Sequence, residues 1–365
     1  MKNKINILFV ISSLNLGGAQ RVLSEMANYW ASKGHNVSIV SFSDENTFYL
    51  LNKNISLINN DLTKKYKNIF EAIKYSFSRI NSIKCIIRTK QIHIIISFMA
   101  IANIESIIAA KISGIPVIIS ERSNPNEDPL PIVWKIARRI LYNFADQMVL
   151  QTEQVKSYYK NYYTNKVTIK NPLRIINYQN VIKEDLILAV GRLEKEKGYD
   201  DLLTAFAQTY SNWNLEIIGE GNERKHLENL ISDLNLNNKV RLIGAVKNVD
   251  SYFNRAQIFI MTSKYEGFPN SLCEAMAFKL ASISYECPFG PSEIIKNGYN
   301  GILVEPGNVH KLSESIQYLI LNEEYRKFLS QNAVNIDNSL NLNIIMTKWE
   351  QVIHKLIIKR SLSLL

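Results

Sequence analysis

The sequence predicts an α/β protein with two doubly wound, Rossmann-like domains. Short apolar segments alternate with amphipathic helical segments along the 365 residues, which is typical of parallel sheets covered by helices. A strand–glycine loop–helix–strand unit begins at residue 5, and a second begins near residue 186. The length suits about two domains of roughly 150 residues each.

The first unit occupies residues 5–42. Residues 5–11 are a continuous apolar run, as expected for a strand buried on both faces. A glycine loop at 14–18 precedes a predicted helix, in which apolar residues recur every three or four positions, and residues 37–42 form the next strand. The apolar helical positions are Val22, Leu23, Met26, Ala27 and Trp30.

The second unit repeats this order. Residues 186–190 predict a strand, 191–198 a charged glycine loop, 202–207 part of a helix and 215–219 the following strand. The polar residues 171–185, which begin with an Asn-Pro turn, predict a linker. Further parallel strands are predicted at 92–97, 117–120, 149–150, 167–169, 240–243, 258–261 and 281–284.

Composition excludes several classes of protein. With 46% hydrophobic and 21% charged residues, the chain is not of the disordered type. Cys85, Cys273 and Cys287 are far apart, which excludes a disulfide scaffold and a CxxC zinc site. The five histidines contain no HxxxH pair, so a zinc hydrolase of that kind is also excluded.

Positive charge is concentrated in the first half. Residues 1–170 hold 22 basic and 11 acidic side chains, whereas 171–365 hold 21 and 22. This imbalance favours an anionic partner, although a soluble lysine-rich surface produces the same pattern. The start of the chain resembles a signal peptide without a cleavage site, and the apolar stretch 91–104 is shorter than the ~20 residues of a membrane span. We therefore expect a cytoplasmic or peripheral protein.

Several glycine loops follow predicted strands. Gly17-Gly18 lies where a strand meets a helix N-terminus, a position that favours phosphate. Arg192 and Lys197 follow the strand at 186–190, where open α/β sheets bind ligands; a surface charge run paired with Glu194 and Glu196 is the alternative.

Glu266 and Glu274 stand eight positions apart. If both were helical, eight residues at 1.5 Å rise would separate them by about 12 Å. That exceeds the roughly 5–9.5 Å between the two carboxylates of a glycoside hydrolase. We expect each carboxylate to contact hydroxyl groups on a different part of one ligand.

Together these motifs resemble retaining glycosyltransferases of family 4 (GT4), which have the GT-B fold. The resemblance covers nearly the whole chain, and its order and spacing are specific. It is carried by residues 17–23, 119–125, 171–172, 190–193, 197–198, 219–221, 266–274, 290–295 and 297–301.

The resemblance implies two domains facing a central cleft: an acceptor-binding domain at 1–170 and a donor-binding domain at 171–343. A helix and basic tail at 344–365 would cross back to the first domain. Arg192 and Lys197 would hold the diphosphate of a UDP-sugar, Glu266 would contact the sugar and Glu274 the ribose. The other implied donor-binding residues are Gly17, Gly18, Gly219, Gly244, Ala245, Val246, Gly267, Phe268, Pro269, Asn270 and Ser271.

Positive groups at a leaving diphosphate stabilise the transition state. The chain contains no Asp-x-Asp, and no cofactor or metal is expected. Relatives often carry a histidine near 121–124, where this chain has Glu121, Arg122 and Asn124. These three residues are the candidate acceptor pocket.

Basic and apolar residues are interleaved at 74–90 and 134–140, which suits an anionic bilayer. Lys84, Arg88 and Arg138 are the cations expected to support vesicle binding. The predicted protein is a hexosyltransferase at the inner face of the plasma membrane, acting on a polyprenyl-diphosphate-linked saccharide for surface-glycan (O-antigen or capsule-like) synthesis. A soluble or glycolipid acceptor is the alternative. A basic nucleic-acid-binding protein is disfavoured because no such module is visible. The sugar and its linkage stay open.

Overall fold

The computed structural model describes residues 4–43, 47–59, 69–122 and 130–363. It divides the chain into two compact units. The first comprises residues 1–172 together with 343–365, and the second comprises 173–342. Within the described residues, no helix combines the length and apolar content needed to cross a membrane.

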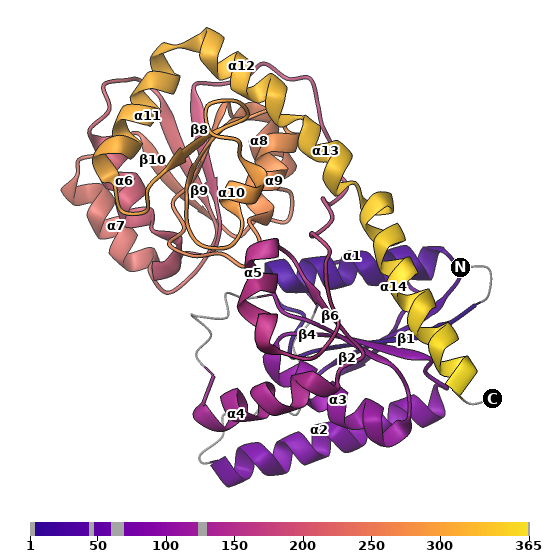
Figure 1. Ribbon diagram of the computed structural model, residues 1–365. Helices are drawn as coiled ribbons and strands as arrows, with labels where there is room; N and C mark the ends of the chain where they lie inside the picture. The colour runs from indigo at the N-terminus through magenta and orange to yellow at the C-terminus, as the bar shows by residue number, and fades with distance from the viewer. Residues whose placement is uncertain (1–3, 44–46, 60–68, 123–129, 364–365) are drawn as a thin grey trace. The chain divides into compact units, whose positions relative to one another are not determined.

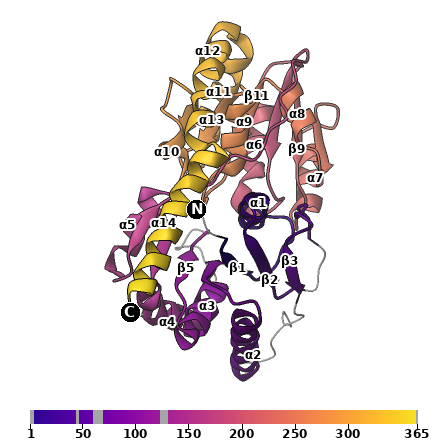
Figure 2. The same ribbon diagram turned by 90° about the vertical axis from the view of Figure 1, so that its right-hand side faces the viewer.

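The first unit is a seven-stranded parallel sheet in the order β3-β2-β1-β4-β5-β6-β7. Helix α1 lies on one face and helices α2 and α3 lie on the other (Figures 1 and 2). The strands are β1 (Asn6–Ile11), β2 (Asn36–Ser41), β3 (Ser56–Asn59), β4 (Ile94–Phe98), β5 (Val117–Ser120), β6 (Gln147–Leu150) and β7 (Lys166–Thr168). The helices are α1 (Gly18–Ser32), α2 (Ile69–Thr89), α3 (Ala100–Ser113), α4 (Ile132–Leu141) and α5 (Glu153–Tyr158).

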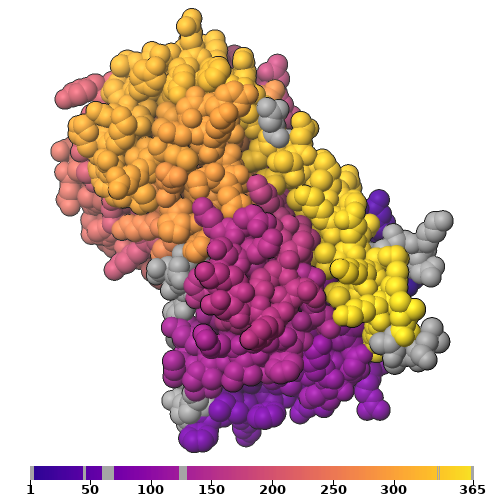
Figure 3. All heavy atoms as spheres, in the orientation of Figure 1, coloured from indigo at the N-terminus to yellow at the C-terminus, as the bar shows by residue number. Residues whose placement is uncertain are grey.

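The last helix, α14 (Leu342–Ser363), belongs almost entirely to the first unit. Trp349 on this helix is buried, and its ring lies 6.0 Å from the guanidinium of Arg122 after β5. The space-filling view shows the helix in yellow against the surface of this unit (Figure 3). The predicted return of the C-terminal helix to the N-terminal unit is therefore confirmed.

The second unit is a six-stranded parallel sheet in the order β10-β9-β8-β11-β12-β13. Helices α6, α7 and α11 cover one face, and α8 and α9 the other (Figure 1). The strands are β8 (Leu186–Val190), β9 (Asn214–Ile218), β10 (Val240–Gly244), β11 (Ile258–Met261), β12 (Ala281–Tyr285) and β13 (Ile302–Val304). The helices are α6 (Tyr199–Ala207), α7 (Arg224–Asp233), α8 (Asp250–Arg255), α9 (Asn270–Ala277), α10 (Pro291–Ile294), α11 (Val309–Leu321), α12 (Glu323–Ala333) and α13 (Asn335–Leu340).

The predicted linker covers residues 171–185, and its residues 173–184 are part of the second unit. They form a strap along α8. Gln179 N donates to Asn254 Oδ1 at 2.9 Å, Asn254 Nδ2 donates to Asn177 O at 3.0 Å, and Glu184 N donates to Arg255 O at 2.8 Å. The strap is therefore fixed to the sheet-covering helices of its own unit.

The expected membrane-facing basic residues divide into two groups. Arg79 and Arg138 are buried, so their assignment to a surface is wrong. Trp134 and the isoleucines at 80, 83, 86 and 87 are also core residues. On α4 the remaining apolar residues Ile132, Ile136 and Ile140 are 69%, 53% and 55% exposed, and Lys135 and Arg139 beside them are exposed too.

Candidate active site

The strand order of the second unit reverses direction at β8. From β8 the chain adds β9 and β10 on one side and β11 to β13 on the other. In open α/β sheets, ligands bind beyond the carboxyl ends of the strands at such a reversal. In this sheet, the loops after β8 and β11 begin at the carboxyl ends of those strands. The first loop carries Lys197 and the second carries Glu266.

Lys197 and Glu266 meet at this position. Lys197 Nζ donates to Glu266 Oε1 at 2.7 Å, and their side chains are 19% and 12% exposed. Both residues are predicted to act on the donor, and the fold brings them together although 69 positions separate them. The alternative that Lys197 belongs to a surface pair with Glu194 or Glu196 is therefore wrong.

Backbone packing fixes the loop that carries Lys197. Gly198 has φ +62°, and a Cβ there would overlap the carbonyl oxygen of Thr262. Thr262 in turn donates its hydroxyl to Lys197 O at 2.9 Å, and Lys264 N donates to Glu196 O at 2.8 Å. The loop after β8 is thus tied directly to the segment after β11, which holds the Lys197–Glu266 pair in place.

The loop after β9 packs against the same region. Gly219 has φ +149°, and a Cβ there would overlap the carbonyl oxygen of Gly191. Gly219 N donates to Gly244 O at 3.0 Å, which brings the ends of β9 and β10 together. Gly244 is buried, Val246 is half-buried and Ala245 is exposed, so this segment offers backbone and little side chain.

Arg192 is placed differently from Lys197. Its side chain is 56% exposed, and Nη2 donates to Glu196 Oε1 at 2.6 Å. The surface-pair interpretation therefore describes Arg192 in this structure. Its predicted contact with a diphosphate stays a prediction, since the long, exposed side chain is held only by an i, i+4 pair, which stabilises by a few tenths of a kcal/mol (~0.3–0.5).

Helix α9 begins at Asn270, four residues after Glu266. Phe268 and Pro269 are buried, while Gly267, Asn270 and Ser271 are half-buried. The first N–H groups of a helix have no partner within the helix and favour an anion. The predicted donor loop therefore combines one carboxylate with backbone donors at the end of the sheet.

The thiol of Cys287 interacts electrostatically with both members of this pair. Burial, together with the Glu266 carboxylate, raises the pKa of Cys287 to about 12. The thiol therefore stays protonated at neutral pH and does not act as a nucleophile.

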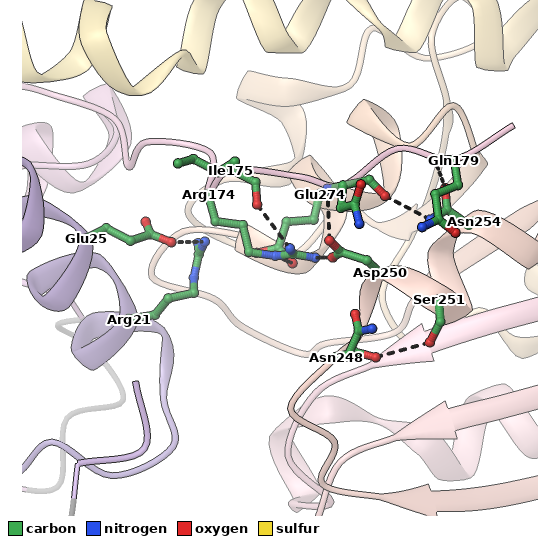
Figure 4. A network of polar contacts seen from close by, with 11 residues as sticks. Arg21, Glu25, Arg174, Ile175, Gln179, Asn248, Asp250, Ser251, Asn254 and Glu274 are labelled. Atoms are coloured by element: carbon green, nitrogen blue, oxygen red, sulfur yellow. Dashed lines mark hydrogen bonds and ion pairs between the residues drawn. The ribbon is translucent and has the colours of Figure 1, made fainter. Parts of the chain in front are cut away.

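Glu274 is buried in the middle of α9, 7% exposed. Arg174 on the strap donates from Nε to Glu274 Oε2 at 3.1 Å, and it also pairs with Asp250 at the start of α8 (Figure 4). Sequence reasoning missed Arg174 and Asp250. Neither lies in a recognised motif, and their contact with Glu274 depends on how the strap folds.

The predicted acceptor residues lie at the end of β5 in the first unit. Glu121 is 1% exposed, accepts from the Tyr142 hydroxyl and lies 3.5 Å from Asn103 Nδ2. Burial and the Glu121 carboxylate raise the pKa of Tyr142 well above its usual value. Glu121 thus connects internal elements, and this inward position argues against a direct acceptor contact. Asn124 lies outside the described residues.

Arg122 is half-buried, and its guanidinium points to other partners. It donates from Nη1 to Asn171 and stacks 3.9 Å from the Phe98 ring centroid. Its Nε and Nη2 atoms are buried and have no hydrogen-bond partner within the described residues. Burial lowers the pKa of Arg122 to about 9, so the group is still a cation at neutral pH with donors to spare.

At the start of α1, Gly17 accepts from the Tyr49 hydroxyl at 3.1 Å, and Gly18 is the exposed first residue of the helix. Their approach to a phosphate stays a prediction. In the described part of the chain, no group of three or more His, Cys, Asp or Glu side chains is arranged to hold a metal ion.

Each of the two units matches a known protein family. Residues 176–335 match the family Glycosyl transferases group 1, and residues 16–173 match Glycosyltransferase Family 4. An α-1,4-N-acetyl-D-galactosaminyltransferase of Campylobacter jejuni, named for an acceptor on PP-undecaprenol, is 30% identical over 96% of this chain and 98% of its own. The amylovoran biosynthesis glycosyltransferase AmsD of Erwinia amylovora is 23% identical over 95% and 99%.

Among solved structures, Anabaena HepE in complex with UDP superimposes with a TM-score of 0.81. It covers 96% of this chain and 100% of its own at 18% identity, a likeness that concerns the fold, which is GT-B. The two family matches and the full-length relative at 30% identity concern descent as well. The chain therefore belongs to family 4 of the glycosyltransferases.

Proposed function

We propose that this glycosyltransferase moves a hexose or N-acetylhexosamine from a UDP-sugar to a saccharide carried on polyprenyl diphosphate, in surface-glycan synthesis. The observation that carries the proposal is the Lys197–Glu266 pair at the switch point of the second sheet, beside the start of α9. The Campylobacter relative is named for a lipid-diphosphate acceptor, AmsD for a polysaccharide, and HepE is described with UDP.

In the proposed reaction, the bond between the anomeric carbon and the diphosphate oxygen breaks, and a bond to the acceptor hydroxyl oxygen forms. Nucleoside diphosphate and one proton are released. Lys197 and Arg192 would stabilise the charge that develops on the leaving diphosphate, and Glu266 would accept from sugar hydroxyls. Because these two cations are at hand, we propose that no metal takes part.

We propose that the configuration at the anomeric carbon is retained. The Campylobacter relative is named for an α linkage, and nucleotide hexoses of this class are commonly α-linked, so an α product corresponds to retention. On the acceptor side, two guanidinium nitrogens of Arg122 have no hydrogen-bond partner among the described residues, and we assign them to an anionic or hydroxyl group of the acceptor.

The donor proposal predicts a selective gain in thermal stability. A ligand that binds only the folded state stabilises the protein and so raises its melting temperature. At a ligand concentration of 100 times its Kd, the free energy of unfolding rises by about 2.7 kcal/mol. A panel of UDP-, GDP- and ADP-sugars is expected to give one UDP-hexose or UDP-N-acetylhexosamine that shifts melting by several degrees. A folded protein whose melting no nucleotide sugar shifts would contradict a preformed donor site.

We further propose that the first unit docks on the anionic inner face of the plasma membrane through α4. The exposed stripe of Ile132, Ile136 and Ile140, flanked by Lys135 and Arg139, combines apolar area with positive charge. This is the chemistry that anionic bilayers bind. The buried Trp134 and Arg138 fix the opposite face of the helix against the unit.

Reversing both charges, Lys135→Glu with Arg139→Glu, is expected to weaken binding to phosphatidylglycerol vesicles in co-sedimentation by ~30-fold or more, since each of the two cations contributes ~1 kcal/mol near such a surface and the new carboxylates are repelled by it. The matched control reverses two exposed lysines of the second unit, Lys311→Glu with Lys327→Glu, and should sediment like the wild type. Equal sedimentation of both double variants would argue against α4 as the docking helix.

A further inference from the structure

Arg174 occupies the start of the strap, directly after the boundary between the two units at Pro172 and Leu173. Its guanidinium lies between two carboxylates from different helices. Nε donates to Glu274 Oε2 on α9 at 3.1 Å, and the other end of the fork pairs with Asp250 on α8. The three side chains are only 19%, 9% and 13% exposed, so water screens these contacts weakly.

The surroundings hold Arg174 itself in place. Its guanidinium lies 5.9 Å from the ring centroid of Phe278, and Nη1 donates to Ile175 O at 3.4 Å. Asp250 is fixed in turn, because its Oδ2 accepts from Asn177 N at 2.9 Å. Figure 4 shows the arrangement, with Arg174 between the two acidic side chains.

The cluster of Arg174, Glu274 and Asp250 carries a net negative charge, because one guanidinium pairs with two carboxylates. Arg174 therefore orients Glu274 without neutralising both carboxylates. Burial tends to lower the pKa of Arg174, but Glu274 and Asp250 outweigh it and raise that pKa. The arginine therefore remains a permanent cation, and the fork geometry restricts the rotation of the Glu274 carboxylate.

We propose that Arg174 is a positioning residue for donor recognition, which holds the Glu274 carboxylate in the orientation that accepts the ribose hydroxyls. Arg174 acts through Glu274 and does not touch the donor. This inference rests on the proposed function and on the expectation, implied by the family resemblance, that Glu274 contacts the ribose of the donor.

The test compares two nucleotides that differ only in the hydroxyls concerned. Calorimetry would measure the binding of UDP and of 2′,3′-dideoxy-UDP to the wild type, Arg174→Ala, Arg174→Lys and Glu274→Gln. Arg174→Ala should weaken UDP binding about tenfold, the equivalent of one charge-assisted hydrogen bond of ~1.5 kcal/mol. The same variant should bind dideoxy-UDP within about twofold of the wild type, and Arg174→Lys should restore part of the UDP affinity.

Arg255 provides a matched control. It also lies between two carboxylates of this unit, pairing with Glu184 at 2.9 Å and Glu216 at 3.0 Å, and neither of these partners is a predicted donor residue. Arg255→Ala should bind both nucleotides like the wild type.

Equal losses of UDP and dideoxy-UDP affinity in Arg174→Ala would indicate general damage and overturn the inference, as would unchanged UDP affinity. If Glu274→Gln loses affinity for UDP but not for dideoxy-UDP, and Arg174→Ala shows no such difference, the inference alone fails. If the wild type binds no nucleoside diphosphate, the proposed donor fails with it.

Discussion

Lys197→Met is expected to lower kcat for sugar transfer by about 100-fold or more, the typical loss when one group that stabilises transition-state charge is removed. The reason is its position: the ammonium lies at the switch point, paired at 2.7 Å with Glu266. Glu266→Gln should cause a loss of the same order, because the neutral amide cannot hold Lys197 or accept as strongly from sugar hydroxyls.

The control for this result lies in the same turn. Lys195 is exposed, and Lys195→Met should leave kcat near the wild-type value. The melting temperature of each variant is measured in parallel, because removing one partner of the half-buried Lys197–Glu266 pair also lowers stability, and a loss of kcat must be separated from a loss of folded protein. Near-wild-type turnover of Lys197→Met or Glu266→Gln would refute their assignment to the reaction.

Arg79→Ala is expected to destabilise the first unit by ~3–5 kcal/mol, the cost of leaving a buried charge without its partner. The Arg79 guanidinium donates to Glu105 at 2.7 to 3.0 Å, and the two side chains are 4% and 0% exposed. Ser76 adds a third donor at 2.7 Å. Burial raises the pKa of Glu105, and its contacts with Arg79 and Ser76 oppose that rise.

The measurement is the melting temperature of the full chain. Arg88→Ala, on the exposed end of the same helix, is the control and should stay within about 0.5 kcal/mol of the wild type. The double substitution Arg79→Met with Glu105→Leu should recover most of the loss, because apolar side chains replace a buried pair at little cost. A small, equal effect of Arg79→Ala and Arg88→Ala would contradict a structural role for the pair.

Most of the fold could be predicted from the sequence, because the central strands are continuous apolar runs. Strands β3 (Ser56–Asn59) and β13 (Ile302–Val304) were not predicted. Both are short edge strands of their sheets, and a short, half-exposed edge carries too few apolar residues to stand out. Their absence from the prediction changes neither the sheet direction nor the fold class.

The sequence does contain a signal that Arg79 is buried, but a count of basic residues does not reveal it. Arg79 precedes Ile83 by four positions and Ile86 by seven, so helical spacing places it on the apolar face. An arginine on a buried stripe requires a partner, here Glu105 from the neighbouring helix. Charge counting alone treats every basic residue as surface, which is why the pair was missed.

The candidate site could also be predicted only in part from the sequence. Family resemblance predicts Lys197 and Glu266, but their contact follows from the strand order β9-β8-β11, which no local pattern specifies. Arg174 reaches Glu274 across 100 positions. Its role depends on residues 173–184 lying along α8 rather than spanning as a free linker, and polar composition does not distinguish these two states.

We propose that this family 4 glycosyltransferase extends a saccharide on polyprenyl diphosphate using a nucleotide sugar. The decisive measurement is the mass of a synthetic polyprenyl-diphosphate-linked saccharide after incubation with the wild-type protein and each UDP-sugar. We expect one donor to add a single hexose or N-acetylhexosamine mass, with stoichiometric release of UDP and no product from Lys197→Met. An unchanged acceptor mass with a donor that the protein binds would contradict the proposed acceptor class.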